Sequence, residues 1–249
     1  MFCLSRSKRV WWFQMNDSIQ IDILTLHPEM FAPLQHSILQ RGQDAGLLNI
    51  QIHNIRDCGR GRYKQVDDAP YGGGSGMVMR VDVIDASLRK LQGKEAHVLL
   101  MDPVGKPFTH HDALRLAKKK HLVFICGHYE GIDARVRENL VDEVLSIGDF
   151  VLTGGELPAM VIVDALCRQI EGVLGNSGSL HEESFSDGLL EASQFTRPQE
   201  YQGWKVPEVL LSGHHANIDQ WRKECSISLT RQLRPDLYKK SFDREDESE

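Results

Sequence analysis

Membrane-spanning segments are absent from this sequence of 249 residues. Apolar runs such as Val98–Met101 and Met160–Val163 are far shorter than the ~20 residues that a helix needs to cross a bilayer. Residues 1 to 18 are basic and aromatic, but they lack the apolar stretch and cleavage site of a signal peptide, so we expect a disordered extension. The sequence therefore predicts neither membrane insertion nor secretion.

Cysteine is scarce and unpaired in the sequence. The five cysteines are an odd number without a C-x-x-C pair, at Cys3, Cys58, Cys126, Cys167 and Cys225. This pattern excludes a disulfide framework and a cysteine zinc site. We therefore expect a reducing compartment, the cytoplasm.

The common catalytic motifs are also missing. Residues 70–77 are rich in glycine but lack the Lys-Ser/Thr ending of a Walker phosphate loop, and no G-x-G-x-x-G follows the first predicted strand. The sequence has no H-E-x-x-H or G-x-S-x-G, and the pairs His110-His111 and His214-His215 lack the i, i+4 spacing of a zinc site. Dehydrogenase, hydrolase and P-loop functions are disfavoured, and no residue is assigned to a metal.

Charge is distributed unevenly along the chain, although the net charge is only -6. Residues 127–195 carry 13 acids against 3 arginines, whereas residues 196–240 carry 8 Lys and Arg against 5 acids. Nucleic-acid phosphates are bound by Lys and Arg. A basic C-terminal region on an acidic body is the part in which an RNA contact is expected.

Short apolar runs, each closed by Gly or Pro, predict buried strands at Ile19–Leu26, Val98–Met101, Leu122–Cys126 and Phe150–Leu152. Helical patterns between them predict a mostly parallel α/β sheet. Ligands bind such sheets beyond the carboxyl ends of the strands. Three glycine-marked loops stand at those ends, with the sequences DPVG (102–105), CGHYEG (126–131) and TGGELP (153–158). Because glycine permits close backbone approach, these loops predict a pocket.

The segment 159–170 is apolar on nearly every side and predicts a buried helix, either in the core or against a second subunit. The polar, Gly/Ser-rich residues 173–195 that follow have a linker composition. Residues 216–237 predict a small helical domain, and residues 243–249 an acidic disordered tail. The expected organisation is an extension (1–18), a catalytic domain (19–173), a linker (174–190) and a helical domain with its tail (191–249).

Five longer strings resemble one known family. They are PYGGGSGM (70–77), CGHYEGIDARV (126–136), SIGDFVLTGGELPAM (146–160), SFSDGLL (184–190) and PEVLLSGHHANI (207–218). In this order and spacing they are similar to the bacterial tRNA (guanine-N1)-methyltransferase family, often called TrmD. The resemblance covers residues 20 to about 238, almost the whole chain.

The resemblance implies a SPOUT methyltransferase fold, with a C-terminal trefoil knot in a mostly parallel sheet and a small all-α C-terminal domain. It also implies a homodimer that methylates N1 of guanine-37 in tRNA with S-adenosylmethionine, and it makes Mg²⁺ a candidate metal ion. Two alternatives are a SPOUT enzyme with another RNA target and an inactive RNA-binding dimer.

The resemblance also assigns residues to the S-adenosylmethionine pocket. They are Leu100, Met101, Pro103, Gly105, Gly127, Tyr129, Glu130, Ser146, Ile147, Gly148, Leu152, Gly154, Gly155 and Pro158. Asp102 and Leu145 depart from the residues found in the family and are expected to affect how the cofactor packs more than the chemistry, whereas His128, which replaces an arginine of relatives, need not alter the site. Glycine-loop backbone and apolar side chains suit a mostly apolar pocket with few polar groups.

Two catalytic residues are carried over. Guanine N1 bears a proton at neutral pH, so a base must remove it, and the family's catalytic aspartate corresponds to Glu183 here. Asp187 is the alternative base. Arg168 matches the arginine expected to donate to guanine O6, where negative charge accumulates.

Several residues are expected to contact RNA. Asp67 and Gly76 match positions near the target guanine and its 5′ neighbour, although Ser75 replaces an expected proline. The candidates for gripping anticodon-stem phosphates are Arg197, Lys205, Arg222, Lys223, Arg231 and Arg234. Because a base must leave its stack to react, we expect the connector with Glu183 to close over a flipped guanine.

Overall fold

The computed structural model describes residues 18–91, 95–175 and 183–242. These residues form two compact units, divided after Gly175. The predictions made for residues 1–17, 176–182 and 243–249 lie outside the described residues.

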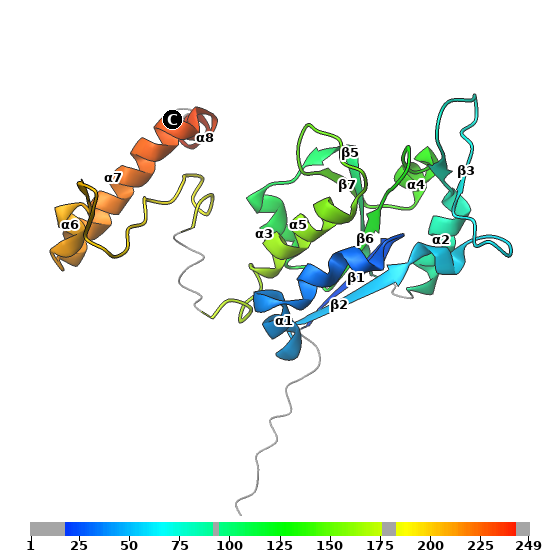
Figure 1. The fold of residues 1–249 in the computed structure, drawn as a ribbon, viewed down its shortest axis with the longest axis horizontal. Helices are drawn as coiled ribbons and strands as arrows, with labels where there is room; N and C mark the ends of the chain where they lie inside the picture. The colour runs from blue at the N-terminus through cyan, green and yellow to red at the C-terminus, as the bar shows by residue number, and fades with distance from the viewer. Residues whose placement is uncertain (1–17, 92–94, 176–182, 243–249) are drawn as a thin grey trace, which may run out of the picture. The chain divides into compact units, whose positions relative to one another are not determined.

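A five-stranded sheet forms the centre of the first unit (Figure 1). Its order is β2-β1-β6-β5-β7 and every neighbouring pair is parallel. The strands are β1 (Ile19–Thr25), β2 (Leu48–Asn54), β5 (His97–Pro107), β6 (His121–Cys126) and β7 (Glu143–Ser146). This arrangement confirms the predicted α/β class with a mostly parallel sheet.

Helices cover both faces of this sheet. The face packed by η1, α1, α3 and α5 contains Phe31, Leu39, Leu116 and Ile162, and the face packed by η2, α2 and α4 contains Ile55, Ile84 and Val136. The helices are η1 (Pro28–Gln35), α1 (Ser37–Asp44), η2 (Ile55–Cys58), α2 (Val81–Lys90), α3 (His110–Leu116), α4 (Ala134–Asn139) and α5 (Glu156–Cys167).

The apolar runs of β1 and β6 follow from this double coverage. Successive residues of a strand point to opposite faces, so Phe124 lies in one core cluster and Ile125 in the other. Strands covered on both faces read as continuous apolar runs rather than alternating ones.

Two strand predictions need correction. Phe150–Leu152 pairs with no strand, and Val151 is 84% exposed; the edge strand is β7 instead. The strand expected at Val98–Met101 extends to Pro107, because Lys106 pairs with Leu145 after a register shift that bulges out residues 102–105. A strand can resume its pairing after a bulge, and an apolar run that stops before the bulge does not predict this continuation.

A pair of two-residue strands, β3 (Asp67–Asp68) and β4 (Val78–Met79), stands apart from the main sheet. Figure 1 shows the chain around β3 projecting away from the five-stranded sheet. The glycine-rich residues 70–77 connect the two strands.

The second unit is mainly helical, with α6 (Glu208–Leu211), α7 (His215–Leu233) and α8 (Pro235–Phe242). It also contains an antiparallel pair, β8 (Glu200–Tyr201) and β9 (Trp204–Lys205), which the all-α expectation omits. These strands have two residues each, too short to leave a periodic pattern.

The described part of the expected linker is a hydrogen-bonded turn. The Phe185 amide donates to the Leu189 carbonyl, and the Leu190 amide donates to Thr230 Oγ1 of α7. Residues 183–190 are therefore attached to the second unit.

Across the described ranges, no helix combines the length and the hydropathy needed to cross a bilayer.

Candidate cofactor pocket

A pocket of about 290 Å³ lies beside the bulge of β5 and beyond the carboxyl ends of β6 and β7. Three loops form it: the bulge at residues 102–104, the loop 127–132 after β6, and the segment 145–158 that runs from the end of β7 into α5. The volume is near the lower limit of small-molecule sites. The pocket lies at the edge of the sheet where the three glycine-marked loops were expected to meet.

Hydrogen bonds join these loops to one another. The Gly155 amide donates to the Gly127 carbonyl over 2.8 Å, and His128 Nδ1 lies 2.6 Å from the Thr153 carbonyl oxygen. Ser146 Oγ donates to the Gly148 carbonyl over 3.0 Å. The loop 127–132 and the segment 145–158 are therefore held to each other before any ligand binds, and the Ser146–Gly148 bond stiffens the latter from within.

Two glycines are required by close packing between the walls. A Cβ on Gly155 would lie 2.8 Å from Cys126 Cα and 2.9 Å from the Gly127 nitrogen, and one on Gly154 would overlap Glu156 Oε2. Contacts this short are not tolerated. The backbone of the 126–131 and 153–158 loops can approach this closely only because both residues lack a side chain.

Two buried groups, the Glu156 carboxylate and the Cys126 thiol, lie next to residues that line the pocket. The Glu156 carboxylate is buried in the first turn of α5 and accepts a hydrogen bond of 2.8 Å from Thr25 Oγ1. Burial, and then the nearby Glu156 carboxylate, raise the pKa of the Cys126 thiol well above its ordinary value. Cys126 therefore stays protonated and is a packing residue rather than a nucleophile.

The pocket brings together twelve of the fourteen residues expected to hold the cofactor. They are Met101, Pro103, Gly127, Tyr129, Glu130, Ser146, Ile147, Gly148, Leu152, Gly154, Gly155 and Pro158. Leu100 and Gly105 do not line it. Leu100 points to the opposite face of β5, and Gly105 packs on the Leu145 backbone, 2.6 Å from where its Cβ would be.

Sequence reasoning missed several lining residues. They are Val104, Gly131, Ile132, Phe150, Val151 and Thr153. All six lie inside or beside the same glycine-marked strings, so extending each assignment along its loop would have found them. Asp102, His128 and Leu145, which depart from the family pattern, also line the pocket.

The glycine-rich loop between β3 and β4 ends beside this pocket. The Glu130 amide donates to the Met77 carbonyl over 3.0 Å, and the Met79 amide donates to the Gly131 carbonyl over 2.9 Å. Gly76 has φ of +81°, and a Cβ there would overlap Glu130 Cγ. Gly76 thus lies against a lining residue, and Asp67 is on β3, the strand that leads into the same loop.

The two expected catalytic residues lie in different units. Arg168 is the C-cap of α5, ten residues beyond Pro158, which is about 15 Å along the helix axis at 1.5 Å per residue. The fold therefore does not bring Arg168 to the pocket of its own chain. Glu183 is half-buried in the turn of the second unit, where the Ser186 amide donates to its carbonyl.

The expected phosphate-binding residues are exposed on the second unit, except Arg234, which lies in the α7–α8 junction and is half-buried. Lys205 lies 3.7 Å from Glu200, and Arg222 lies 3.8 Å from Asp219, both loose ion pairs. Arg231 packs over the Tyr238 ring, and Arg234 donates to Asp236. Exposed pairs of this kind contribute little to stability, so these cations remain available to a ligand.

Fold and pocket together define an α/β protein with a pocket of small-molecule size among glycine loops at the carboxyl edge of a parallel sheet. A family model described as tRNA (Guanine-1)-methyltransferase TrmD matches residues 19–240. The chain belongs to this family.

Curated relatives are similar in sequence to this chain over most of their length. The tRNA (guanine-N(1)-)-methyltransferase of Syntrophomonas wolfei is 53% identical over 92% of this chain and 95% of its own. Proteins of the same name from Desulforamulus reducens (54% identical, 89% of each chain) and Staphylococcus aureus (53% identical, 89% of this chain and 91% of the other) are similar to the same extent.

Proposed function

We propose that this chain transfers a methyl group from S-adenosylmethionine to N1 of guanine-37 in tRNA, as a cytoplasmic homodimer. The observation that carries the proposal is the family match over residues 19–240, together with one pocket lined by twelve of the residues expected from that family. In this proposal residues 19–173 are the catalytic domain, 174–190 the linker and 191–249 the RNA-binding domain.

S-adenosylmethionine suits the chemistry of the pocket. Backbone amides and carbonyls of the glycine loops offer hydrogen bonds to an adenine edge and a ribose, while Leu152, Ile147 and Pro158 offer apolar contact to a ring. The cradle at Gly154 and Gly155, which a Cβ would fill, supports close approach of backbone to ligand. When bound, the cofactor supplies an electrophilic methyl group on a sulfonium.

Glu183 is the proposed base. Its carboxylate takes the N1 proton, so that the freed electron pair of N1 is available for bonding. Negative charge then accumulates on guanine O6, and the Arg168 guanidinium donates a hydrogen bond there. Asp187 is the alternative base, and its Oδ1 accepts from the Leu189 amide over 3.2 Å.

The homodimer is supported by an uncovered apolar surface and by the position of Arg168. Phe150, Val151, Leu157 and Val161 are exposed large hydrophobic residues of the pocket loop and of α5. Grouped apolar side chains of this kind mark interaction sites. Because Arg168 stands at the far end of α5 from its own pocket, we assign it to the pocket of the other subunit.

The trefoil knot is part of the proposal. Three loops packed together at one edge of the sheet, with the Gly155 amide bonded to the Gly127 carbonyl, are compatible with a chain threaded there. Among the described residues, no three His, Cys, Asp or Glu side chains are grouped to hold a metal ion, so no residue is assigned to Mg²⁺.

A methyl-transfer assay tests the proposal. Radiolabelled S-adenosylmethionine is supplied with tRNA transcripts that carry guanine or adenine at position 37, and incorporation into the guanine transcript alone is expected. Equal incorporation into both would contradict the base specificity and favour another RNA target. Incorporation into neither would favour an RNA-binding dimer without catalysis.

A further inference from the structure

Two tyrosine side chains stand in solvent on either side of β3. Tyr63 is 88% exposed and Tyr71 is 100% exposed. Tyr63 belongs to a short hairpin, residues 60–65, closed by two backbone hydrogen bonds between Arg60 and Gln65. Tyr71 belongs to the glycine-rich loop that follows β3. An aromatic ring fully in water offers its face to a ligand and contributes nothing to the core of the first unit.

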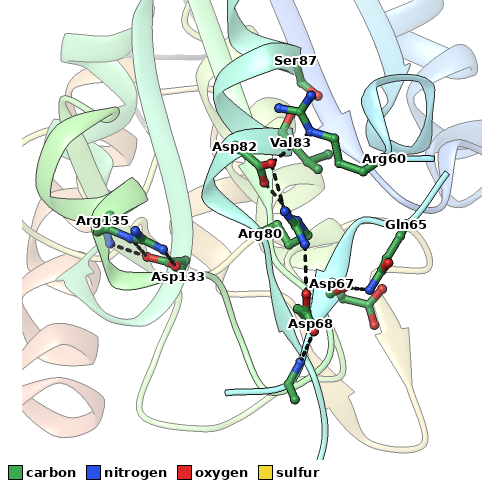
Figure 2. Close-up of polar contacts among 11 residues, drawn as sticks. Arg60, Gln65, Asp67, Asp68, Arg80, Asp82, Val83, Ser87, Asp133 and Arg135 are labelled. Carbon is green, nitrogen blue, oxygen red and sulfur yellow. Dashed lines mark hydrogen bonds and ion pairs between the residues drawn. The ribbon is translucent and has the colours of Figure 1, made fainter. Parts of the chain in front are cut away.

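An ion-pair network joins the hairpin of Tyr63 to β3, the strand that precedes the loop of Tyr71 (Figure 2). Arg80 donates to Asp68 of β3 over 2.9 Å and to Asp82 of α2 over 3.0 and 3.1 Å, and Arg60 Nε donates to Asp82 over 2.9 Å. Hydrogen bonds from Arg80 and, to a smaller extent, from Arg60 outweigh burial and lower the pKa of the Asp82 carboxyl to about 2. The 60–65 hairpin and β3 are thereby attached to the first turn of α2.

One cation of the hairpin is left for a ligand. Arg60 is used in the network, and Lys64 Nζ donates to Asp57 over 3.1 Å. The exposed side chain of Arg62 makes no hydrogen bond or ion pair with any other residue in the described ranges. The hairpin therefore presents one unpaired guanidinium beside an exposed aromatic ring.

Backbone hydrogen bonds connect this surface to the pocket. The Arg80 amide donates to the Val66 carbonyl beside the hairpin, and Met77 and Met79 bond to the loop that lines the pocket. The loop of Tyr71 and the hairpin of Tyr63 are therefore attached to a wall of the pocket in which the target base would react.

We propose that Tyr63, Tyr71 and Arg62 bind the unpaired nucleotides that flank the methylated guanine, with the tyrosine rings stacking on bases and Arg62 pairing with a phosphate. This inference rests on the proposed function. Proteins bind unpaired RNA bases by stacking on aromatic rings, and an adjacent cation neutralises the backbone. Stacking accepts any base, so this surface adds affinity and leaves the choice of guanine to the pocket.

The test measures RNA affinity directly. The full chain is titrated into a fluorescent anticodon stem-loop RNA, and anisotropy gives Kd for the unmodified protein and for each variant. Tyr63→Ala and Tyr71→Ala are each expected to weaken binding about tenfold or more, as for loss of one stacked base. Tyr63→Phe and Tyr71→Phe keep the ring and are expected to bind within about twofold of the unmodified protein.

Arg62→Ala is expected to weaken binding severalfold and to reduce the slope of log Kd against log salt by about one, as when a single phosphate is no longer bound. Arg41→Ala is the matched control, because Arg41 is an exposed arginine of α1 whose side chain has no bonded partner within the described part of the chain. Its Kd and salt slope are expected to stay unchanged. Melting temperatures confirm that each variant is folded.

The inference is overturned if both alanine variants bind like the unmodified protein, or if the phenylalanine variants bind as weakly as alanine. If the chain methylates guanine-37 but the tyrosine variants bind the stem-loop RNA normally, this inference fails and the proposed function stands. A chain that does not methylate tRNA, yet binds the stem-loop through Tyr63 and Tyr71, would keep the inference and overturn the proposed function.

Discussion

The two units of the chain differ in how much apolar surface they bury. The first has two clusters of buried side chains, one on each face of its sheet. In the second, Thr230 is the single buried residue among those described, while Trp204, Leu211 and Leu233 are exposed. Burial of apolar area is the main driving force of folding. The pocket is therefore built on a packed core, whereas the described part of the second unit buries little apolar surface of its own.

This difference predicts a division of labour. The first unit should hold the cofactor in a preformed site, and the second should supply the base and the contacts to the anticodon-stem phosphates. Substitutions in one unit should then leave the other unit's task unchanged. The following four predictions are arranged from the largest expected effect to the smallest.

Glu183→Gln keeps the size of the side chain and removes its ability to accept a proton. We expect kcat to fall about 10²- to 10⁴-fold, the usual contribution of a general base. Cofactor affinity, measured by calorimetry, should stay unchanged because Glu183 lies in the second unit. Asp187→Asn is the control and should stay active. If Glu183→Gln is active and Asp187→Asn is inactive, Asp187 is the base instead.

Gly155→Ala places a methyl group 2.8 Å from Cys126 Cα, between two walls of the pocket. Overpacking costs about 1–3 kcal/mol, so cofactor affinity should weaken about ten- to a hundredfold. Calorimetry with S-adenosylmethionine measures the change. Gly175→Ala is the control, since a Cβ there meets nothing within 4 Å. Normal cofactor affinity in Gly155→Ala would contradict the preformed cradle.

The double substitution of Arg222 and Lys223 by alanine removes two exposed cations of α7. We expect KM for tRNA to rise by less than about tenfold, with a salt slope smaller by roughly one for each phosphate that is no longer bound. Steady-state kinetics at several salt concentrations measures both. A similar rise of KM in Lys118→Ala, an exposed lysine of the first unit, would argue against a dedicated surface on α7.

Asp112→Asn tests the stability of the first unit. The buried Asp112 carboxylate accepts from the Thr109 amide and hydroxyl and from Lys106 and Arg115. Burial acts to raise its pKa, but these hydrogen bonds outweigh that effect and lower it from 3.8 to about 2. We expect the substitution to reduce the free energy of unfolding by about 1 kcal/mol at pH 7, as for loss of a helix cap.

The pH dependence has a definite sign. A carboxyl whose pKa is lowered in the folded state stabilises the protein above pH 4 and loses that stabilisation as the pH falls from 4 toward 2. In denaturant unfolding across this range, the free energy of unfolding should fall less steeply with decreasing pH in Asp112→Asn than in the unmodified protein. Asp44→Asn is the exposed control. If the free energy of unfolding falls equally with pH in Asp112→Asn and in the unmodified protein, Asp112 is not a source of the acid sensitivity.

Local patterns predicted much of the site and less of the sheet. The glycine strings located the three pocket loops, because positive φ and missing side chains are requirements that a short string can satisfy by itself. The strand at the edge was misplaced at Phe150–Leu152, since the pairing of Leu145 with both Met101 and Lys106 depends on residues far apart in the sequence. Leu100 was assigned to the pocket although strand alternation points it to the other face.

The sequence by itself determined the class of the fold, the family and the identity of most pocket residues. Only the tertiary structure decided that the bulge at 102–105 and the loops after β6 and β7 share one cavity, and that Arg80 ties Asp68 to Asp82. The physical reason is range. Turn geometry and apolar patterning act between neighbours in the chain, whereas strand order, register and ion-pair networks depend on how distant segments pack.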